Sequence, residues 1–185
     1  ASKSAPEEPK NAIVVTGNVQ ARLFIAENGR PQKCIVLASS GDAGFDRITC
    51  QSLIRTARFV PAKDMTGHRI RRVIVRSAAL SGPGTQAVKL EDRGLPEFIF
   101  LVNQLPNGQP NMATRVEVQV DALGAITSCH AAPTEKDADL AEMACGSLSV
   151  VWKAMPEQDD SGTPFRYVRE FQVELRHTGI QRSAI

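Results

Sequence analysis

Alternating hydrophobic and polar positions mark the strands of this chain. Val116, Val118 and Val120 alternate with polar residues, which is the period-2 pattern of a half-buried antiparallel strand with one side toward water. Asn28-Gly29 separates two apolar runs and is a strong signal for a β-hairpin, and Leu123-Gly124 is a similar turn. The pattern predicts second hairpin strands over 33–38 and 128–132.

A helical period follows each hairpin. Apolar residues fall at i, i+3, i+4 and i+7 from Cys50 to Ala57, and Cys145, Leu148 and Trp152 repeat the stripe. Polar stretches that end in carboxylates, 39–42 and 133–137, precede the two helices and suit helix N-termini. Prolines end the helices, and third strands are predicted over 69–76 and 164–175.

The chain repeats itself at an offset of 95 positions without a gap. The repeat predicts an α+β protein with two tandem small units, roughly 17 to 80 and 112 to 177. Each unit is a three-stranded antiparallel sheet packed by one helix, in the order strand, strand, helix, strand. The matching pairs include Gly29 with Gly124, Cys34 with Cys129, Cys50 with Cys145, Pro61 with Pro156, Asp64 with Asp159 and Gly67 with Gly162.

The domain boundaries follow from the repeat and from turn-forming residues. We expect a flexible lead-in over 1–10, a first domain over 11–80, a linker over 81–95 that opens with SGPGT, a second domain over 96–177 and a tail over 178–185. The apolar segment 98–105 predicts an extra strand that pairs with the second unit.

Composition and charge narrow the classes of function. Hydrophobic residues make up 42% and charged residues 23%, as in globular proteins, and a net charge of +2 argues against a dedicated nucleic-acid binder. No run approaches the roughly 18 apolar residues of a membrane helix. Residues 1–80 carry 13 Lys/Arg against 6 Asp/Glu, and 81–185 carry 9 against 14. The net charges of the two halves are therefore +7 and −5. Either the two halves present separate solvated surfaces, or they attract each other, within a chain or between chains.

The repeat also suggests how the four cysteines pair. Cys34 and Cys50 are 16 positions apart, as are Cys129 and Cys145. In each unit one cysteine lies on the second strand and the other on the helical face that should cover it. This favours the disulfides Cys34–Cys50 and Cys129–Cys145, which suit an oxidising compartment. The alternative is four reduced, buried thiols.

No catalytic constellation is visible in the sequence. Ser39-Ser40-Gly41 together with His68 or His130 lacks the Gly-x-Ser-x-Gly elbow and any legible triad order, so a helix-capping turn is the better interpretation. No Cys-x-x-Cys pair is present, and the three histidines lie far apart. We expect no enzyme activity, no cofactor and no metal.

The first unit contains the motifs Gly17-x-Val19, Asn28-Gly29, Ser39-Ser40-Gly41 and Arg58-Phe59-x-Pro61-Ala62. In these motifs it closely resembles the TonB C-terminal domain family, in a tandem, cysteine-containing variant. The second unit keeps its glycines, cysteines and prolines but departs at Ser-Ser-Gly (Ala132-Pro133-Thr134) and at Arg-Phe (Lys153-Ala154).

The resemblance implies a periplasmic, non-enzymatic protein that binds a peptide or protein by strand addition, as in TonB-dependent transport. The implied partner is the N-terminal peptide of an outer-membrane transporter. We expect capture beside the third strand of the first unit, at Arg71, Arg72, Val73, Ile74, Val75 and Arg76. The alternative is an envelope scaffold or oligomerisation module, such as a homodimer, whose sheet edges serve self-association.

A last expectation concerns the back of the first sheet. Phe24, Ile35 and Leu37 alternate away from the helix-facing residues, so all three share the face that the helix leaves open. Because this apolar face is unsuited to water, we expect it to form a domain or oligomer interface. Its cover is the segment near 98–102, the second unit or a partner chain.

Overall fold

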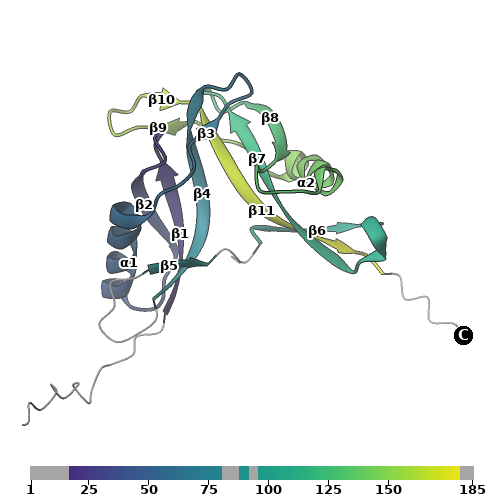
Figure 1. Cartoon of the computed structure of the whole chain (residues 1–185), viewed down its shortest axis with the longest axis horizontal. Helices are drawn as coiled ribbons and strands as arrows, with labels where there is room; N and C mark the ends of the chain where they lie inside the picture. The colour runs from purple at the N-terminus through teal and green to yellow at the C-terminus, as the bar shows by residue number, and fades with distance from the viewer. Residues whose placement is uncertain (1–16, 81–87, 92–95, 180–185) are drawn as a thin grey trace, which may run out of the picture.

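The computed structural model of the chain describes residues 17–80, 88–91 and 96–179 (Figure 1). The first half contains β1 (Gly17–Ile25), β2 (Pro31–Ala38), α1 (Ala43–Thr56), β3 (Ala62–Lys63), β4 (Arg69–Leu80) and β5 (Val88–Glu91). The second half contains β6 (Phe98–Val102), the 3-10 turn η1 (Pro106–Gly108), β7 (Asn111–Val120), β8 (Ile126–Ala131), α2 (Ala138–Val151), β9 (Glu157–Gln158), β10 (Pro164–Phe165) and β11 (Tyr167–His177).

The predicted order of elements is confirmed in both halves. The helices α1 and α2 begin and end 95 positions apart. The Asp42 and Asp137 carboxylates accept hydrogen bonds from the third helical N–H, at 2.8 and 2.9 Å, as N-caps do. The polar stretches before the helices therefore start them as the sequence indicated.

Two separate three-stranded sheets were expected, and this prediction is wrong. One nine-stranded mixed sheet runs through both halves in the order β2-β1-β4-β11-β7-β8, with β3, β5 and β6 paired beside this path. The third strands join the halves through a short parallel pairing of Arg71–Val73 with Tyr167–Arg169. Each of these strands had one edge left over within its own unit, and the two edges satisfy each other's N–H and C=O groups.

The two helices cover opposite faces of this sheet. Ile74 lies in a core with Leu23 and α1, whereas the adjacent Val73 lies in the core that contains α2. Neighbouring residues of a strand point to opposite faces. The continuous sheet therefore has an α1 face and an α2 face. The side of each unit's strands that its own helix leaves uncovered lies on the same face of the sheet as the other unit's helix.

A glycine in each hairpin turn allows the chain to pass closely over it. Gly29 has φ +81°, and a Cβ there would lie 2.0 Å from the Phe59 carbonyl oxygen. Gly124 has φ +87° and lies in the same way against Pro156. Only glycine fits both requirements, which explains why these turns recur together with the proline after the helix.

The connecting segments differ in part from expectation. The predicted extra strand is confirmed as β6, which pairs with β11 of the second unit. The predicted linker, 81–95, contains β5, which pairs with Ser77–Leu80 of β4. The lead-in 1–10, the remainder of the linker and most of the tail lie outside the described residues. Within the described ranges, no helix is both long and apolar enough to cross a membrane.

Candidate functional site

The predicted capture edge is already paired within the chain. At the start of β4, Arg69–Ile70 pair with β3. On the side of β4 away from β1, Arg71–Val73 pair with β11 and Ser77–Leu80 pair with β5. Only Ile74, Val75 and Arg76 have no ladder partner there among the described strands. Arg71, Arg72 and Val73, half of the residues expected to bind a peptide, therefore pair at the junction between the two units, and only a three-residue stretch of that edge is open.

The arginines of this strand hold carboxylates of the other unit. An Arg72 Nη lies 2.5 Å from Glu117 Oε1, and its other Nη lies 3.8 Å from Glu170. Arg76 also donates to Glu170. The side chains of Arg72 and Arg76 are only 11% and 14% exposed, so these ion pairs are shielded from water.

Further ion pairs connect the halves around the junction. Arg22 of β1 donates to Glu157 of β9, and Arg166 lies 3.0 Å from Asp64 in the β3–β4 turn. Four of these five contacts join an arginine of the first half to a glutamate of the second. Of the two interpretations of the charge asymmetry, attraction within one chain is the one confirmed.

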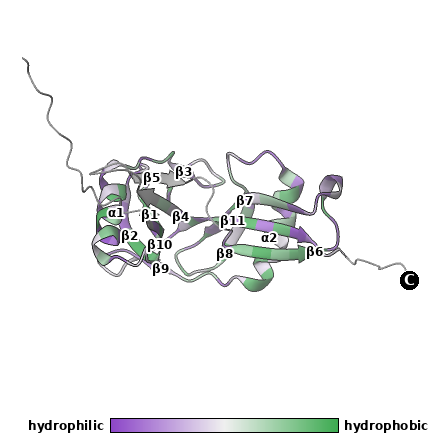
Figure 2. Ribbon diagram, turned by 90° about the horizontal axis from the view of Figure 1, so that it is seen from below, coloured by the Kyte–Doolittle hydropathy of each residue, from purple (hydrophilic) through white to green (hydrophobic). Residues whose placement is uncertain are grey.

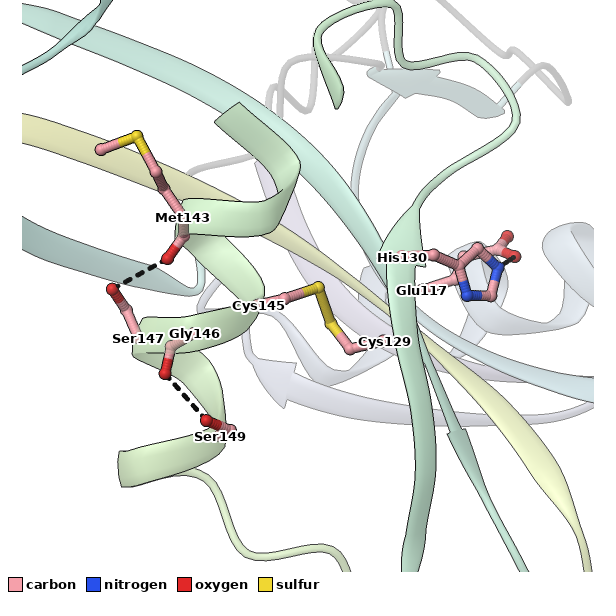
Figure 3. Close-up of a disulfide and its surroundings, with 8 residues drawn as sticks. All are labelled: Glu117, Cys129, His130, Met143, Cys145, Gly146, Ser147 and Ser149. Atoms are coloured by element: carbon pink, nitrogen blue, oxygen red, sulfur yellow. Dashed lines mark hydrogen bonds and ion pairs between the residues drawn. A yellow bond between two sulfur atoms is a disulfide. The ribbon is translucent and has the colours of Figure 1, made fainter. Parts of the chain in front are cut away.

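Glu117 was expected to face water, but it is buried. It is 2% exposed, and Gln119 on the same side of β7 is 7% exposed, because the first unit covers the back of this strand. Burial raises the pKa of Glu117 above its ordinary value, Arg72 opposes that shift and Glu170 adds to it. His130 Nε2 lies 3.7 Å from Glu117 Oε2 (Figure 3).

The three apolar residues predicted at an interface separate into two groups. Phe24 packs against the core of the second unit, beside Val73 and Phe165. Ile35 and Leu37 remain 38% and 51% exposed. The second unit therefore covers the Phe24 end of the α2 face, whereas the β2 end of that face is open within this chain. The segment around 98–102 packs on β11 instead.

The outermost strand β2 has a free edge. It lies at the end of the sheet and pairs only with β1 within the described residues. Figure 2 shows β2 beside β1 at one end of the molecule, and Ile35 and Leu37 are the large hydrophobic residues of β2 that are exposed. The strand β8 at the opposite end also pairs only with β7, but four of its six residues are partly covered.

Both predicted disulfides are confirmed. Cys34 is bonded to Cys50, with Cα atoms 5.6 Å apart, and Cys129 is bonded to Cys145, with Cα atoms 5.8 Å apart. Each bond joins a second strand to the helix that covers it, and Figure 3 shows Cys129 and His130 on opposite sides of β8. No cysteine is left free. These bonds fit an oxidising compartment.

The serine-rich turn caps α1. The Ser39 and Ser40 hydroxyls both donate to the Asp46 carboxylate, at 2.5 and 2.7 Å. The Ser39 hydrogen bond is the largest cause of the lowered pKa of Asp46. His130 lies beside Glu117 in the other unit, so the serines and this histidine are not brought together. Among residues 17–80, 88–91 and 96–179, no three His, Cys, Asp or Glu side chains are placed to hold a metal ion.

Comparison with known proteins identifies the first unit. Residues 11–76 match the family described as Gram-negative bacterial TonB protein C-terminal. No curated protein and no solved structure matches the chain. The family is one of non-enzymatic interaction domains in the Gram-negative envelope, and the two disulfides agree with that setting. Residues 11–76, about a third of the chain, are therefore similar to the TonB C-terminal family.

Proposed function

We propose that this protein binds a partner protein in the periplasm by adding one of the partner's strands to the free edge of β2. The observation that carries the proposal is this edge, beside which Ile35 and Leu37 are exposed. An unpaired strand offers a row of N–H and C=O groups, and the neighbouring apolar side chains add contacts for the arriving strand.

The edge of β2 suits this role better than the other edges of the sheet. The third-strand edge of the first unit is largely paired, with β11 at Arg71–Val73 and with β5 at Ser77–Leu80. The edge of β8 carries polar residues and belongs to the unit outside the family match. The edge of β2 combines membership of the matched unit with exposed apolar residues, which a monomer in water would otherwise leave unprotected.

The partner that the family resemblance implies is the N-terminal peptide of an outer-membrane transporter, which would place the protein in TonB-dependent transport. A titration of the ¹⁵N-labelled chain with such peptides tests this proposal. We expect chemical-shift changes along Pro31–Ala38, and we expect Leu37→Asp to weaken binding. Leu123→Asp is the matched control, because Leu123 is an equally apolar side chain, 85% exposed, in a turn of the other unit. Shift changes confined to β4, or none, would contradict capture at β2.

A second candidate is an envelope scaffold whose sheet edges serve association, and one observation favours it. The third strands of the two units already pair with each other, so the fold uses strand edges to join like units. If two chains associate in the same way through β2, the exposed Ile35 and Leu37 become buried between them. Sedimentation equilibrium separates the candidates: a monomer that binds peptide supports capture, and a dimer that Leu37→Asp dissociates supports scaffolding.

A further inference from the structure

A groove lies between the two units on the α2 face of the first sheet. Its volume is about 400 Å³, within the range of small binding pockets. Strands β1, β2 and β4 of the first unit form one wall, and the β9–β10 hairpin of the second unit forms the other. The lining residues used below are Phe24, Lys33, Arg71, Asp160, Ser161 and Phe165. We call this the junction groove.

Two aromatic rings in the junction groove each carry a cation. The Arg22 guanidinium, which is paired with Glu157, lies 5.1 Å from the centroid of the Phe24 ring. The Arg71 guanidinium lies 4.2 Å from the centroid of the Phe165 ring, and the Lys33 ammonium lies 5.5 Å from that of Phe24. Neither Arg71 nor Lys33 has a carboxylate within 4 Å in the described part of the chain, although Arg71 is near enough to Asp159 to help lower the pKa of that carboxyl. A guanidinium that stacks on a ring keeps its in-plane N–H donors available for a carboxylate.

Arg72 and Asp159, two other charged residues of the groove, already have partners. Arg72 is paired with Glu117 and Glu170. The Asp159 carboxylate accepts hydrogen bonds from the Ser161 and Thr163 N–H groups of its own turn, both at 3.0 Å. Asp160 is exposed at the hairpin tip. The cations that remain for a ligand are Lys33 and Arg71.

The repeat contains the same groove a second time, without this chemistry. The equivalent groove has about 250 Å³ and lies between β7, β8 and the β3–β4 turn. There Gln119 stands in place of Phe24, Ile70 in place of Phe165, and Ser128 in place of Lys33. Arg166 is the counterpart of Arg71, but it is paired with Asp64 at 3.0 Å. The fold therefore makes the hollow twice, and among the described residues only the junction groove holds two rings and two cations without a carboxylate within 4 Å.

We propose that the junction groove binds a segment of a partner protein in which a carboxylate side chain stands next to an aromatic or aliphatic one. The carboxylate accepts hydrogen bonds from Lys33 and Arg71, and the apolar side chain packs against Phe24 and Phe165. The site needs both units, because Phe165 comes from the second and the other three residues from the first. It is separate from strand addition at the free edge of β2.

The test uses the whole chain and two acetylated, amidated tetrapeptides, Gly-Phe-Glu-Gly and Gly-Phe-Gln-Gly. Binding is followed by chemical-shift changes in the ¹⁵N-labelled protein. We expect the glutamate peptide to shift residues around Lys33, Arg71 and Phe165 and to bind about tenfold more tightly than the glutamine peptide, the difference that one charge-assisted hydrogen bond makes. Equal affinities of the two peptides, or shifts that centre on the equivalent groove, would overturn the proposal.

Variants copied from the equivalent groove provide the controls. Lys33→Ser and Phe165→Ile each install the counterpart residue, and we expect each to weaken the glutamate peptide about tenfold. Arg166→Gln changes only the other groove and should leave the affinity unchanged. If the substitutions at Lys33 and Phe165 both leave the affinity intact in folded protein, the groove does not bind the peptide. A tetrapeptide is too short to form a stable added strand, so its result does not depend on capture at β2.

Discussion

Glu117 of β7 and Glu170 of β11 lie directly opposite each other in the sheet, and both are at least 95% buried. Like charges in this arrangement repel, since directly opposed side chains of neighbouring strands are in contact. Arg72 of the first unit lies against both carboxylates, and Arg76 adds a second contact to Glu170. The first unit therefore both covers this pair of carboxylates and supplies the arginines that compensate their charge.

Replacing Arg72 should destabilise the whole protein. Arg72→Met leaves Glu117 without its guanidinium partner and Glu170 with Arg76 alone, so we expect a loss of about 3 to 5 kcal/mol in the free energy of unfolding. Urea denaturation measures it. Arg71→Met is the matched control, because Arg71 is on the same strand without an ion pair, and it should cost less than about 1 kcal/mol. Equal losses for the two variants would show that the junction does not depend on this charge.

The raised pKa of Glu117 predicts the direction of a pH effect. The charged groups that face this carboxyl are Arg72, Glu170 and His130. A carboxyl with a raised pKa in the folded state contributes its stability at pH below about 4.3, the unfolded value, and loses it as the pH rises through the folded value. The free energy of unfolding of the unsubstituted protein, relative to that of the Glu117→Gln variant, should therefore fall as the pH rises from about 4 to 7.

This comparison is best made in a His130→Asn background, so that the side chain beside Glu117 is uncharged at every pH. Urea denaturation at several pH values gives the two curves. If the stability of the protein with Glu117 instead rises with pH relative to the Glu117→Gln variant, the attraction to Arg72 lowers the pKa of Glu117 by more than burial raises it.

Each disulfide lies within one unit, and both should contribute about equally to the stability of the protein. The double variant Cys34→Ser/Cys50→Ser opens a 16-residue separation, so we expect about 3 kcal/mol less stability. Cys129→Ser/Cys145→Ser should cost a similar amount, because its separation is the same. Thermal unfolding measures both, and non-reducing peptide mapping checks the connectivity. A link between Cys34 and Cys129 would contradict the structure.

Leu37 should matter for binding and not for folding. It is 51% exposed, so we expect Leu37→Asp to change the free energy of unfolding by no more than about 0.5 kcal/mol. Leu23→Asp, on the same hairpin at 0% exposure, should cost several kcal/mol because it buries an unpaired charge. If Leu37→Asp lowers the mass of the particle in solution, a second copy covers this face, as the scaffold alternative requires.

Local patterns predicted most of the elements. The 95-residue repeat, the capping carboxylates Asp42 and Asp137 and the cysteine spacing all act within one unit, so the sequence was sufficient for them. The strand β5 was missed, although Val88 and Leu90 alternate with Lys89 and Glu91 in a period-2 pattern. The turn residues before it led to a linker prediction.

The junction between the units depends on contacts that no local pattern contains. Arginines at 71, 72 and 76 are also typical of a protected edge strand, and Glu117 alternates with valines as a solvent-facing residue would. Only the parallel pairing of β4 with β11 brings these charges together and buries them. The charge asymmetry of the two halves indicated, as one of two interpretations, that they attract each other, but it did not predict that β4 pairs with β11.

Capture of a strand by β2 is tested most directly by hydrogen exchange of backbone amides, with and without the N-terminal peptide of a TonB-dependent transporter. Strand addition forms new backbone hydrogen bonds, so the outward N–H groups between Pro31 and Ala38 should exchange more slowly when the peptide is bound. The amides of Arg71–Val73, which already lie in the ladder with β11, should not change. Unchanged exchange along β2 at a saturating peptide concentration, or slower exchange at β4 instead, would contradict the account.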